Sequence, residues 1–191
     1  MEMNVCGRVF VNSALWRFLN RKYVLPTVLE HRFSKNVKRV LDLGCGSGDT
    51  TLELARRFPS AQIVGVDPDP YQIQKARWHD TDSRLRFLVG DGQRLPFKNG
   101  SFDAVFAFDV MHHIEQYKRA VLEVNRVLCK GGYFCCVDVD KKFIRGIVKW
   151  LDNTQSFFSE EEFSATLQSS GFTIKEGGRK SFFFFVIARK R

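Results

Sequence analysis

The sequence predicts an α/β fold built on a doubly wound, mostly parallel sheet of seven strands. Apolar segments of strand length alternate with segments of helical periodicity along the chain. A glycine-rich turn follows the first such strand, and carboxylates follow several others. With 191 residues, 44% of them hydrophobic, the chain can bury one compact core. We expect residues 37–191 to form this domain, with residues 1–36 as a helical segment before it.

The first strand leads into a tight turn that a ligand can approach. Residues 40–43 read as a short buried strand and residues 50–58 as the helix after it. Glycine permits positive φ and a close approach of another group to the backbone. The alternative is a strand-to-helix turn without any ligand. Three glycines occupy every second position between the two elements: Gly44, Gly46 and Gly48.

The glycine spacing narrows the class of ligand. A dinucleotide fingerprint would require glycines at 44, 46 and 49, but position 49 is Asp. An acidic side chain there would repel a pyrophosphate held by the helix dipole. The turn therefore predicts a ligand that resembles a nucleoside and is cationic or zwitterionic.

A carboxylate after the second strand fits the same ligand. Asp67 follows the strand at 62–66 and comes 19 residues after Gly48. This is close to the offset at which a carboxylate on the next strand meets ribose hydroxyls. Pro68 and Pro70 stop the strand and fix the turn. A solvated acidic turn is the alternative for Asp67 taken alone.

The third and fourth strands also end in carboxylates. We expect these strands at residues 85–89 and 104–108. The tips of parallel strands line the ligand crevice of an open sheet. Four carboxylates lie at or just beyond such tips: Asp42, Asp67, Asp91 and Asp109.

The C-terminal third completes the sheet. A helix is expected over residues 120–128, closed by the basic charge and glycines of Lys130–Gly132, and the fifth strand is expected at residues 133–139. Ser159 and Glu162 form a capping-box pattern for a helix that ends at Gly171. The last two strands are expected at residues 172–176 and 182–188.

Two histidines after the fourth strand are candidates for proton transfer. His112 and His113 lie where a base could reach an acceptor, and histidine has a suitable pKa. The alternative is that one packs against the following helix while the other orients a ligand. The five cysteines include no CxxC pair, so we expect no structural zinc and no other metal. Their odd number indicates reduced thiols and a cytoplasmic location.

Five motifs taken in order resemble class I S-adenosylmethionine-dependent methyltransferases. The resemblance is to the small type 11 domains related to ubiquinone and menaquinone methylases, and it covers about residues 37–139. The motifs are VLDLGCGSGDT, IVGVDPDP, FLVGDGQRLPF, FDAVFAFDVMHHI and VNRVLCKGGYFCCVD. The resemblance implies a Rossmann-like sheet with an antiparallel seventh strand. It also implies S-adenosylmethionine as cofactor and S-adenosylhomocysteine as its product.

The resemblance also implies roles for individual residues. The glycines would pass beneath the methionine and ribose parts of the cofactor, and Asp42 would orient its amino group. Asp67 would accept both ribose hydroxyls. Four further residues would complete the cofactor site, and two are candidates for catalysis. The four are Pro68 against the adenine, Asp91 and Gly92 at its edge, and Phe108 along the methionine; the catalytic candidates are Asp109 and His113.

Charge and aromatic content bear on the methyl acceptor. The net charge of +9 is concentrated at the ends, with +6 in residues 1–39 and +5 in residues 175–191. Basic and aromatic residues are interleaved near the N-terminus, so residues 1–36 are expected to form helical segments that cover the cleft and hold the acceptor. The alternatives are a solvated amphipathic helix and a segment that contacts a membrane surface. We expect a small, apolar or anionic acceptor. The alternatives are RNA, which the basic charge favours, and a protein that binds the cofactor without catalysis.

Overall fold

The computed structural model describes residues 18, 20–34, 36–79, 82–141, 158–180 and 183–191. Its strands are β1 (Arg39–Leu43), β2 (Gln62–Asp67), β3 (Leu85–Val89), β4 (Phe102–Phe108), β5 (Leu128–Val139), β6 (Phe172–Lys180) and β7 (Phe183–Lys190). Its α-helices are α3 (Pro26–Leu29), α4 (Asp49–Arg57), α5 (Pro70–Ala76), α6 (Tyr117–Val127) and α8 (Glu160–Ser169). The other helical elements are the π-helical η1 (Asn20–Val24) and the 3₁₀ turns η2 (Arg77–His79) and η3 (Met111–His113).

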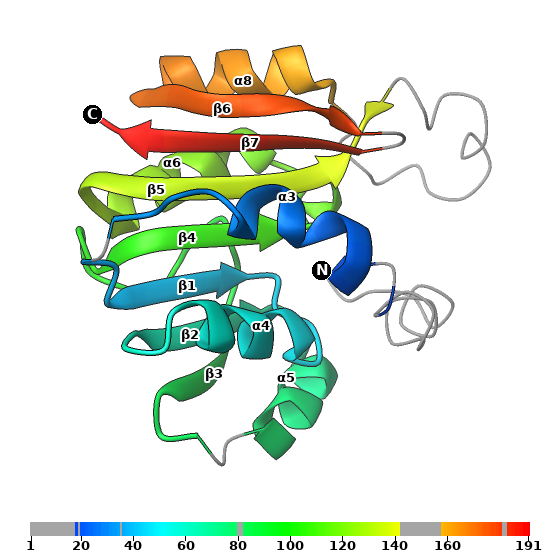
Figure 1. The fold of residues 1–191 in the computed structure, drawn as a ribbon, viewed down its shortest axis with the longest axis vertical. Helices are drawn as coiled ribbons and strands as arrows, with labels where there is room; N and C mark the ends of the chain where they lie inside the picture. Colours follow the sequence, from blue (N-terminus) through cyan, green and yellow to red (C-terminus); the bar gives the residue numbers. More distant parts are fainter. Residues whose placement is uncertain (1–17, 19, 35, 80–81, 142–157, 181–182) are drawn as a thin grey trace.

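All seven strands form one sheet in the order β3-β2-β1-β4-β5-β7-β6 (Figure 1). The pairs among β1 to β5 are parallel, whereas β7 runs antiparallel to both β5 and β6. This confirms the predicted sheet and its antiparallel seventh strand. The order changes direction between β1 and β4, so the carboxyl ends of these two strands flank the crevice where such sheets bind ligands.

Helices cover both faces of the sheet because its strands carry apolar side chains on both sides. In β1, Val40 joins the core layer beneath α3, α4 and α5, whereas Leu41 and Leu43 join the layer beneath α6 and α8. In β4, Phe106 and Val105 divide in the same way. The two layers hold the central strands rigidly and so fix the positions of their carboxyl ends.

The described part of the N-terminal segment packs on the sheet. Val28 of α3 is fully buried in the same core layer as Phe106 and Tyr133. His31 extends this contact, because its Nδ1 lies 2.9 Å from Glu176 Oε2 of β6. Residues 1–17, where much of the predicted basic and aromatic surface falls, lie outside the described residues. Within the described ranges, no helix has the length and apolar character needed to cross a membrane.

The boundaries of α6 and α8 differ in how far the sequence determines them. The helix expected over residues 120–128 is α6, which ends at Val127. Leu128 takes an extended conformation, pairs with Phe102 and begins β5, so Lys130–Gly132 lie within this strand and not at the end of the helix. Pairing within the sheet therefore overrides the turn-forming glycines. The prediction that Lys130–Gly132 close the helix before a strand that begins at residue 133 was wrong. The capping box is confirmed, since the Ser159 hydroxyl accepts the Glu162 N–H and the Glu162 carboxylate accepts the Ser159 N–H.

Candidate functional site

The glycine turn is built from backbone that only glycine adopts easily. Gly44, Gly46 and Gly48 have φ values of 75°, 51° and 91°. The amide of Gly44 donates to Val66 O at 2.7 Å, which ties the end of β1 to β2. A Cβ on Gly44 would lie 2.2 Å from Val110 Cγ2, whereas a Cβ on Gly46 would meet nothing within 4 Å. The turn is thus packed at its start and open at its centre, where a ligand can lie.

Asp42 lies beneath this turn with half of its carboxylate engaged. Its Oδ2 accepts the hydroxyls of Thr50 at 2.7 Å and Thr51 at 2.6 Å. The residue is 1% exposed, and its Oδ1 has no hydrogen-bond partner among the described residues. Burial raises the pKa of Asp42 to about 6, although the hydrogen bonds from the two threonine hydroxyls partly lower it. A buried acceptor of this kind fits an ammonium group or a water molecule.

The buried Asp42 carboxylate predicts a dependence of stability on pH. Because folding raises the pKa of Asp42, its carboxyl group stabilises the folded state fully at pH values below its ordinary pKa. This stabilisation is lost as pH rises through about 6. We therefore expect Asp42→Asn to increase the free energy of unfolding by about 1–3 kcal/mol at pH 8. At pH 5 the difference should be smaller. Urea denaturation at both pH values measures it.

Asp103 provides the control for this prediction. Although burial opposes it, the hydrogen bond from Arg39 lowers the pKa of Asp103. Its contribution to stability is therefore fully present above its ordinary pKa and is lost only as pH falls below that value, so Asp103→Asn should cost the same stability at pH 5 and pH 8. A stability difference for Asp42→Asn that is equal at pH 5 and pH 8 would contradict the assignment.

Asp67 joins the glycine turn to the start of α5. Its Oδ2 accepts the Gly46 N–H at 3.0 Å and its Oδ1 accepts the Asp69 N–H at 2.9 Å. Burial raises the pKa of Asp67, and these two hydrogen bonds oppose that shift. Asp69 in turn caps α5, where its Oδ1 accepts the Tyr71 N–H at 3.0 Å. The carboxylate is therefore held in place beside the open centre of the turn.

The remaining predicted cofactor residues lie along the same edge. Pro68 is exposed directly after Asp67, and Phe108 is buried at the end of β4. Asp91 is exposed and accepts the Gln93 N–H at 2.8 Å. Gly92 is buried, and a Cβ there would lie 3.2 Å from both Ile114 and Leu43 side chains. The structure thus brings the predicted positions to the carboxyl edge of β1, β2, β3 and β4.

A buried ionic cluster follows β4. Asp109 has a left-handed backbone with φ of 54°, and its amide donates to Val137 O of β5. His112 Nδ1 lies 2.5 Å from Asp138 Oδ1 and 3.9 Å from Asp109 Oδ1. The Asp138 and His112 side chains are 0% and 7% exposed, but that of Asp109 is 20% exposed. Asp109 is therefore the member of this cluster that can meet a ligand.

The cluster determines which side chains hold protons. Burial works against a charged His112, but the Asp138 carboxylate prevails and raises the pKa of His112 to about 9. Burial and the nearby Asp138 raise the pKa of Asp109 to about 6, although His112 lowers it. At neutral pH the cluster holds an imidazolium between two carboxylates. This arrangement favours a structural role for His112. The ring of the partly exposed His113 lies beside it, with 3.9 Å between the two ring centres.

Asp138 was not predicted as a site residue. Its Oδ2 accepts the N–H groups of Met111 and His112 at 2.9 Å and 3.3 Å, so it shapes the turn that carries Asp109. Asp109, His112 and Asp138 also place metal-binding types of atom within 4.8 Å of one another. The hydrogen bond between His112 and Asp138 and the longer ion pair between His112 and Asp109 account for the arrangement. The signal in the sequence was an acidic residue near the end of the fifth predicted strand, at the same edge as the other carboxylates.

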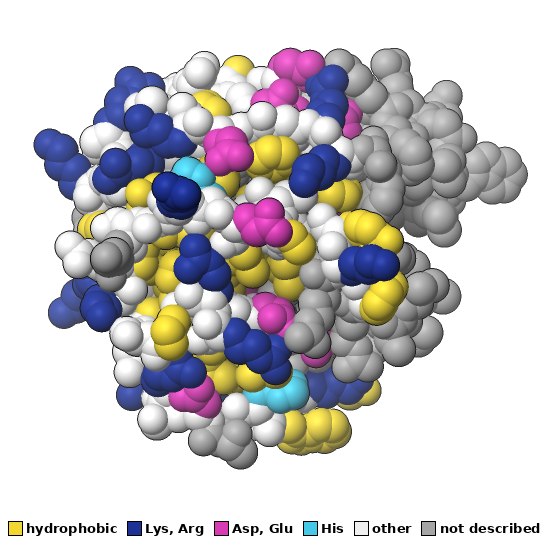
Figure 2. All heavy atoms as spheres, in the orientation of Figure 1, with side chains coloured by type: hydrophobic (Ala, Val, Ile, Leu, Met, Phe, Trp, Pro, Cys, Tyr) yellow, Lys and Arg dark blue, Asp and Glu magenta, His cyan; other side chains and the backbone are white. Residues whose placement is uncertain are grey.

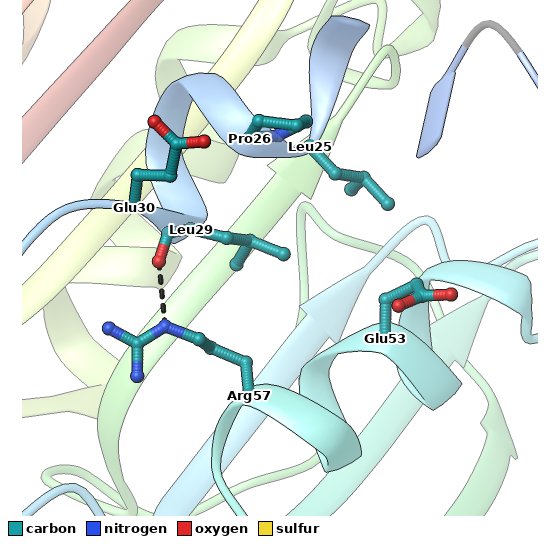
Figure 3. A pocket seen from close by; sticks show the side chains of 6 residues that line it. All are labelled: Leu25, Pro26, Leu29, Glu30, Glu53 and Arg57. Carbon is teal, nitrogen blue, oxygen red and sulfur yellow. Dashed lines mark hydrogen bonds between the residues drawn. The ribbon is translucent and has the colours of Figure 1, made fainter. Parts of the chain in front are cut away.

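A separate pocket of about 500 Å³ lies between α3 and α4 (Figure 3). Arg57 crosses it, with Nε donating to Leu29 O at 2.6 Å and Nη2 to His31 O at 3.0 Å. The pocket contains none of the predicted site residues. Its lining is Leu25, Pro26, Leu29, Glu30, Glu53 and Arg57.

Comparisons with known proteins agree with this geometry. The methyltransferase domain family, type 11, matches residues 41–136. The demethylmenaquinone methyltransferase of Thermus thermophilus is 41% identical over 101 residues, which are 51% of this chain and 46% of that protein. The fatty-acid O-methyltransferase of Mycolicibacterium smegmatis is 38% identical over 106 residues, 56% and 39% of the respective lengths.

A solved structure shows the same fold over the whole chain. A protein from Pyrococcus horikoshii superposes with a TM-score of 0.83 at 22% identity and covers 100% of both chains. In contrast, the matched segments span less than half the length of the curated relatives. Because the family match covers half of this sequence, from β1 through most of β5, the chain belongs to the methyltransferase domain family of class I S-adenosylmethionine-dependent methyltransferases.

Proposed function

We propose that this protein transfers a methyl group from S-adenosylmethionine to a small apolar acceptor. The observation that carries the proposal is the open centre of the glycine turn, bordered by the held Asp67 carboxylate and the half-engaged Asp42 carboxylate. These groups suit a nucleoside that carries an ammonium group. When bound, the cofactor supplies an activated methyl group from its sulfonium.

The residues of this chain would position the two reactants. Asp67 would accept ribose hydroxyls, Asp42 would face the amino group, and Gly46 would let the ligand approach the backbone. Much of the acceleration of methyl transfer can come from aligning donor and acceptor in a dry pocket. A dedicated base is therefore optional. Within the described cluster, Asp109 has a partly exposed side chain and a pKa of about 6. These two properties suit Asp109 to take a proton from an acceptor.

The charge of the cluster favours an uncharged acceptor over an anionic one. With Asp109 ionised, two carboxylates surround one imidazolium, and the excess negative charge would repel an anion. Exposed aromatic residues near the N-terminus favour an apolar partner or a membrane surface. Phe18 and Tyr23 are 57% and 52% exposed, and Lys22 Nζ lies 5.4 Å and 5.3 Å from their ring centres.

RNA is the competing acceptor. The sequence pI near 9.5 favours phosphate contacts. On the face drawn in Figure 2, Lys and Arg side chains gather along the left edge, but over the middle of the face Asp and Glu side chains lie between them and interrupt the basic surface. Radiolabelled S-adenosylmethionine, incubated with the protein and either total RNA or lipid extract, separates the two. Label in lipid supports the proposal, and label in RNA alone would overturn the acceptor class.

Asp67 provides the test of the cofactor site. Replacing Asp67 with alanine removes the acceptor for ribose hydroxyls, so the binding of S-adenosylhomocysteine should weaken by about 1–3 kcal/mol. Isothermal titration calorimetry at pH 7.5 measures this loss. Asp103→Ala is the matched control, because Asp103 lies at the amino end of β4 and binds Arg39. An unchanged affinity in Asp67→Ala would remove Asp67 from the site, and no binding by the unmodified protein would refute the proposed function.

A further inference from the structure

The outer face of α5 and η2 carries a stripe of aromatic and basic side chains. Tyr71, Lys75 and Trp78 follow one another at i, i+4 and i+7, so they lie along one side of this helical segment. Trp78 is 77% exposed, the highest fraction among the large hydrophobic side chains of the described residues, and Tyr71 is 48% exposed. The opposite side of α5 is buried, and its residues are Gln72, Ile73 and Ala76.

A second cluster of the same kind lies around η1. The Lys22 ammonium lies between the exposed rings of Phe18 and Tyr23, 5.4 Å and 5.3 Å from their centres. In the first cluster, the Lys75 ammonium lies 4.7 Å from the ring centre of Tyr71. Each cluster thus holds a cation beside exposed aromatic rings. We call Tyr71, Lys75 and Trp78 the α5 cluster, and Phe18, Lys22 and Tyr23 the η1 cluster.

The η1 cluster lies toward the start of α4. Leu29 O, at the end of α3, accepts Arg57 Nε, at the end of α4. In the pocket between these helices, Leu25 lies toward Glu53 and Leu29 toward Arg57, so the two helices run in the same direction (Figure 3). Because η1 precedes α3, it lies near the level at which α4 begins. That level is the glycine turn, since Gly48 is the N-cap of α4.

The α5 cluster borders the same turn from the other side. Tyr71 is in the first turn of α5, and its N–H donates to Asp69, directly beyond the carboxyl end of β2. Helices α3, α4 and α5 contribute to one core layer and so cover the same face of the sheet. In Figure 1, α5 and the dark blue start of the described chain both lie on the side toward which the β1 arrow points. One extended surface can therefore touch both clusters beside the glycine turn.

The charge around the two clusters is positive. Residues 18–29 and residues 70–79 each contain two Lys or Arg and no Asp or Glu. The acidic side chains of α4, which lies between them, are engaged: Asp49 accepts the Ser47 hydroxyl and Glu53 accepts Arg56. Basic side chains attract anionic lipid head groups, and Trp and Tyr rings favour the level of those head groups. Both properties match an anionic lipid surface.

We propose that the α5 cluster and the η1 cluster together form a peripheral contact with an anionic lipid bilayer. The aromatic rings enter the head-group region, and the two lysines lie against lipid phosphates. The contact places the edge with the glycine turn next to the bilayer, where an apolar methyl acceptor would be concentrated. The inference goes beyond the proposed function, because binding to lipid requires neither cofactor nor methyl transfer.

Nucleic acid is the other polyanion that basic and aromatic side chains bind. Single strands bind such surfaces by stacking their bases on open ring faces. In these clusters, lysine ammonium groups already lie over the rings of Phe18, Tyr23 and Tyr71. The exposed parts of these rings, together with Trp78, suit insertion among head groups. The arrangement therefore favours lipid over RNA.

Sedimentation with vesicles tests the contact on the full chain. One set of sucrose-loaded vesicles contains equal parts of phosphatidylcholine and phosphatidylglycerol, and the other contains phosphatidylcholine alone. The unmodified protein should partition at least about tenfold more strongly onto the anionic vesicles. Raising the salt concentration should reduce this difference, because salt screens the attraction between the basic side chains and the head groups.

Two double variants separate the rings from the charges. Tyr71→Ser with Trp78→Ser removes the rings of the α5 cluster and should weaken partition onto the anionic vesicles by about tenfold. Lys22→Gln with Lys75→Gln should weaken it by about fivefold per charge and leave partition onto phosphatidylcholine unchanged. Leu122→Ser is the matched control, because Leu122 is 57% exposed but belongs to α6 on the other face of the sheet. It should have no effect.

Several outcomes would overturn the inference. They are no partition of the unmodified protein onto either set of vesicles, equal partition onto both, and unchanged partition in the two double variants. Gel shifts with total RNA that are lost in the same variants, without sedimentation on vesicles, would assign the surface to RNA instead. Thermal unfolding checks that each variant is folded, and if the aromatic variant is not, the lysine variant decides. Binding of S-adenosylhomocysteine, measured separately, tests the proposed function.

Discussion

Replacing Asp138 with alanine is expected to lower the free energy of unfolding by about 4 kcal/mol. This is the usual cost of removing one partner of a buried ion pair. The change leaves the His112 imidazolium buried without its 2.5 Å partner. It also removes the acceptor for the Met111 N–H and the Val139 N–H. Urea denaturation followed by circular dichroism at pH 7 measures the loss.

The pH dependence separates this ion pair from a packing defect. Because the pKa of His112 is raised from 6.5 to about 9, the stabilisation is complete below pH 6.5 and is lost as pH rises through about 9. The difference between the two proteins should therefore narrow above that pH. Asp138→Asn keeps an oxygen for the backbone N–H groups but not the charge, so a smaller loss is expected. A loss that is the same at pH 6 and pH 10 would contradict the assignment.

Gly44→Ala is expected to destabilise the fold, whereas Gly46→Ala is expected mainly to weaken ligand binding. At Gly44 the new Cβ would lie 2.2 Å from Val110, and φ is 75°, so the fold should lose about 2–5 kcal/mol. At Gly46, φ is 51° but the space around a Cβ is open, so the fold should lose only about 1–2 kcal/mol.

The effect of these substitutions on ligand affinity should not follow their effect on the free energy of unfolding. Gly46→Ala fills the space proposed for the cofactor, so S-adenosylhomocysteine should bind more than about tenfold weaker although the protein remains folded. Thermal unfolding with and without S-adenosylhomocysteine measures both quantities on the same samples. Gly44→Ala combined with Val110→Ala should recover part of the lost stability, since the side chain in contact is then shortened. Normal binding by Gly46→Ala would place the ligand elsewhere.

The features that could be predicted from sequence are those with a local physical cause. Only glycine adopts positive φ at little steric cost, so the sequence predicts positive φ at Gly44, Gly46 and Gly48, and all three have it. The capping box at Ser159 is likewise a pattern of four adjacent residues. Asp67 was identified from its spacing, and the structure places it against Gly46. Its role toward the cofactor stays a prediction.

The features that were missed depend on contacts between distant segments. The bond between His112 and Asp138 joins residues that are 26 positions apart, and it exists because β4 and β5 are neighbours. The burial of Gln72 depends on which face of α5 meets the sheet, although glutamine is a typical surface residue. The start of β5 was placed too late because Leu128 pairs with Phe102, a contact that no local pattern contains.

The central strand pair also has a consequence for the order of folding. Val40 of β1 pairs with Ala104 of β4, so the chain must close a loop of more than 60 residues before these strands meet. Pairings of this kind slow the search for the native state. Asp42 and Gly44 come from one strand of this pair and Asp109 from the other, so the crevice between them takes shape only when that loop has closed. Intermediates that already contain the β6–β7 hairpin could still lack the ligand site entirely.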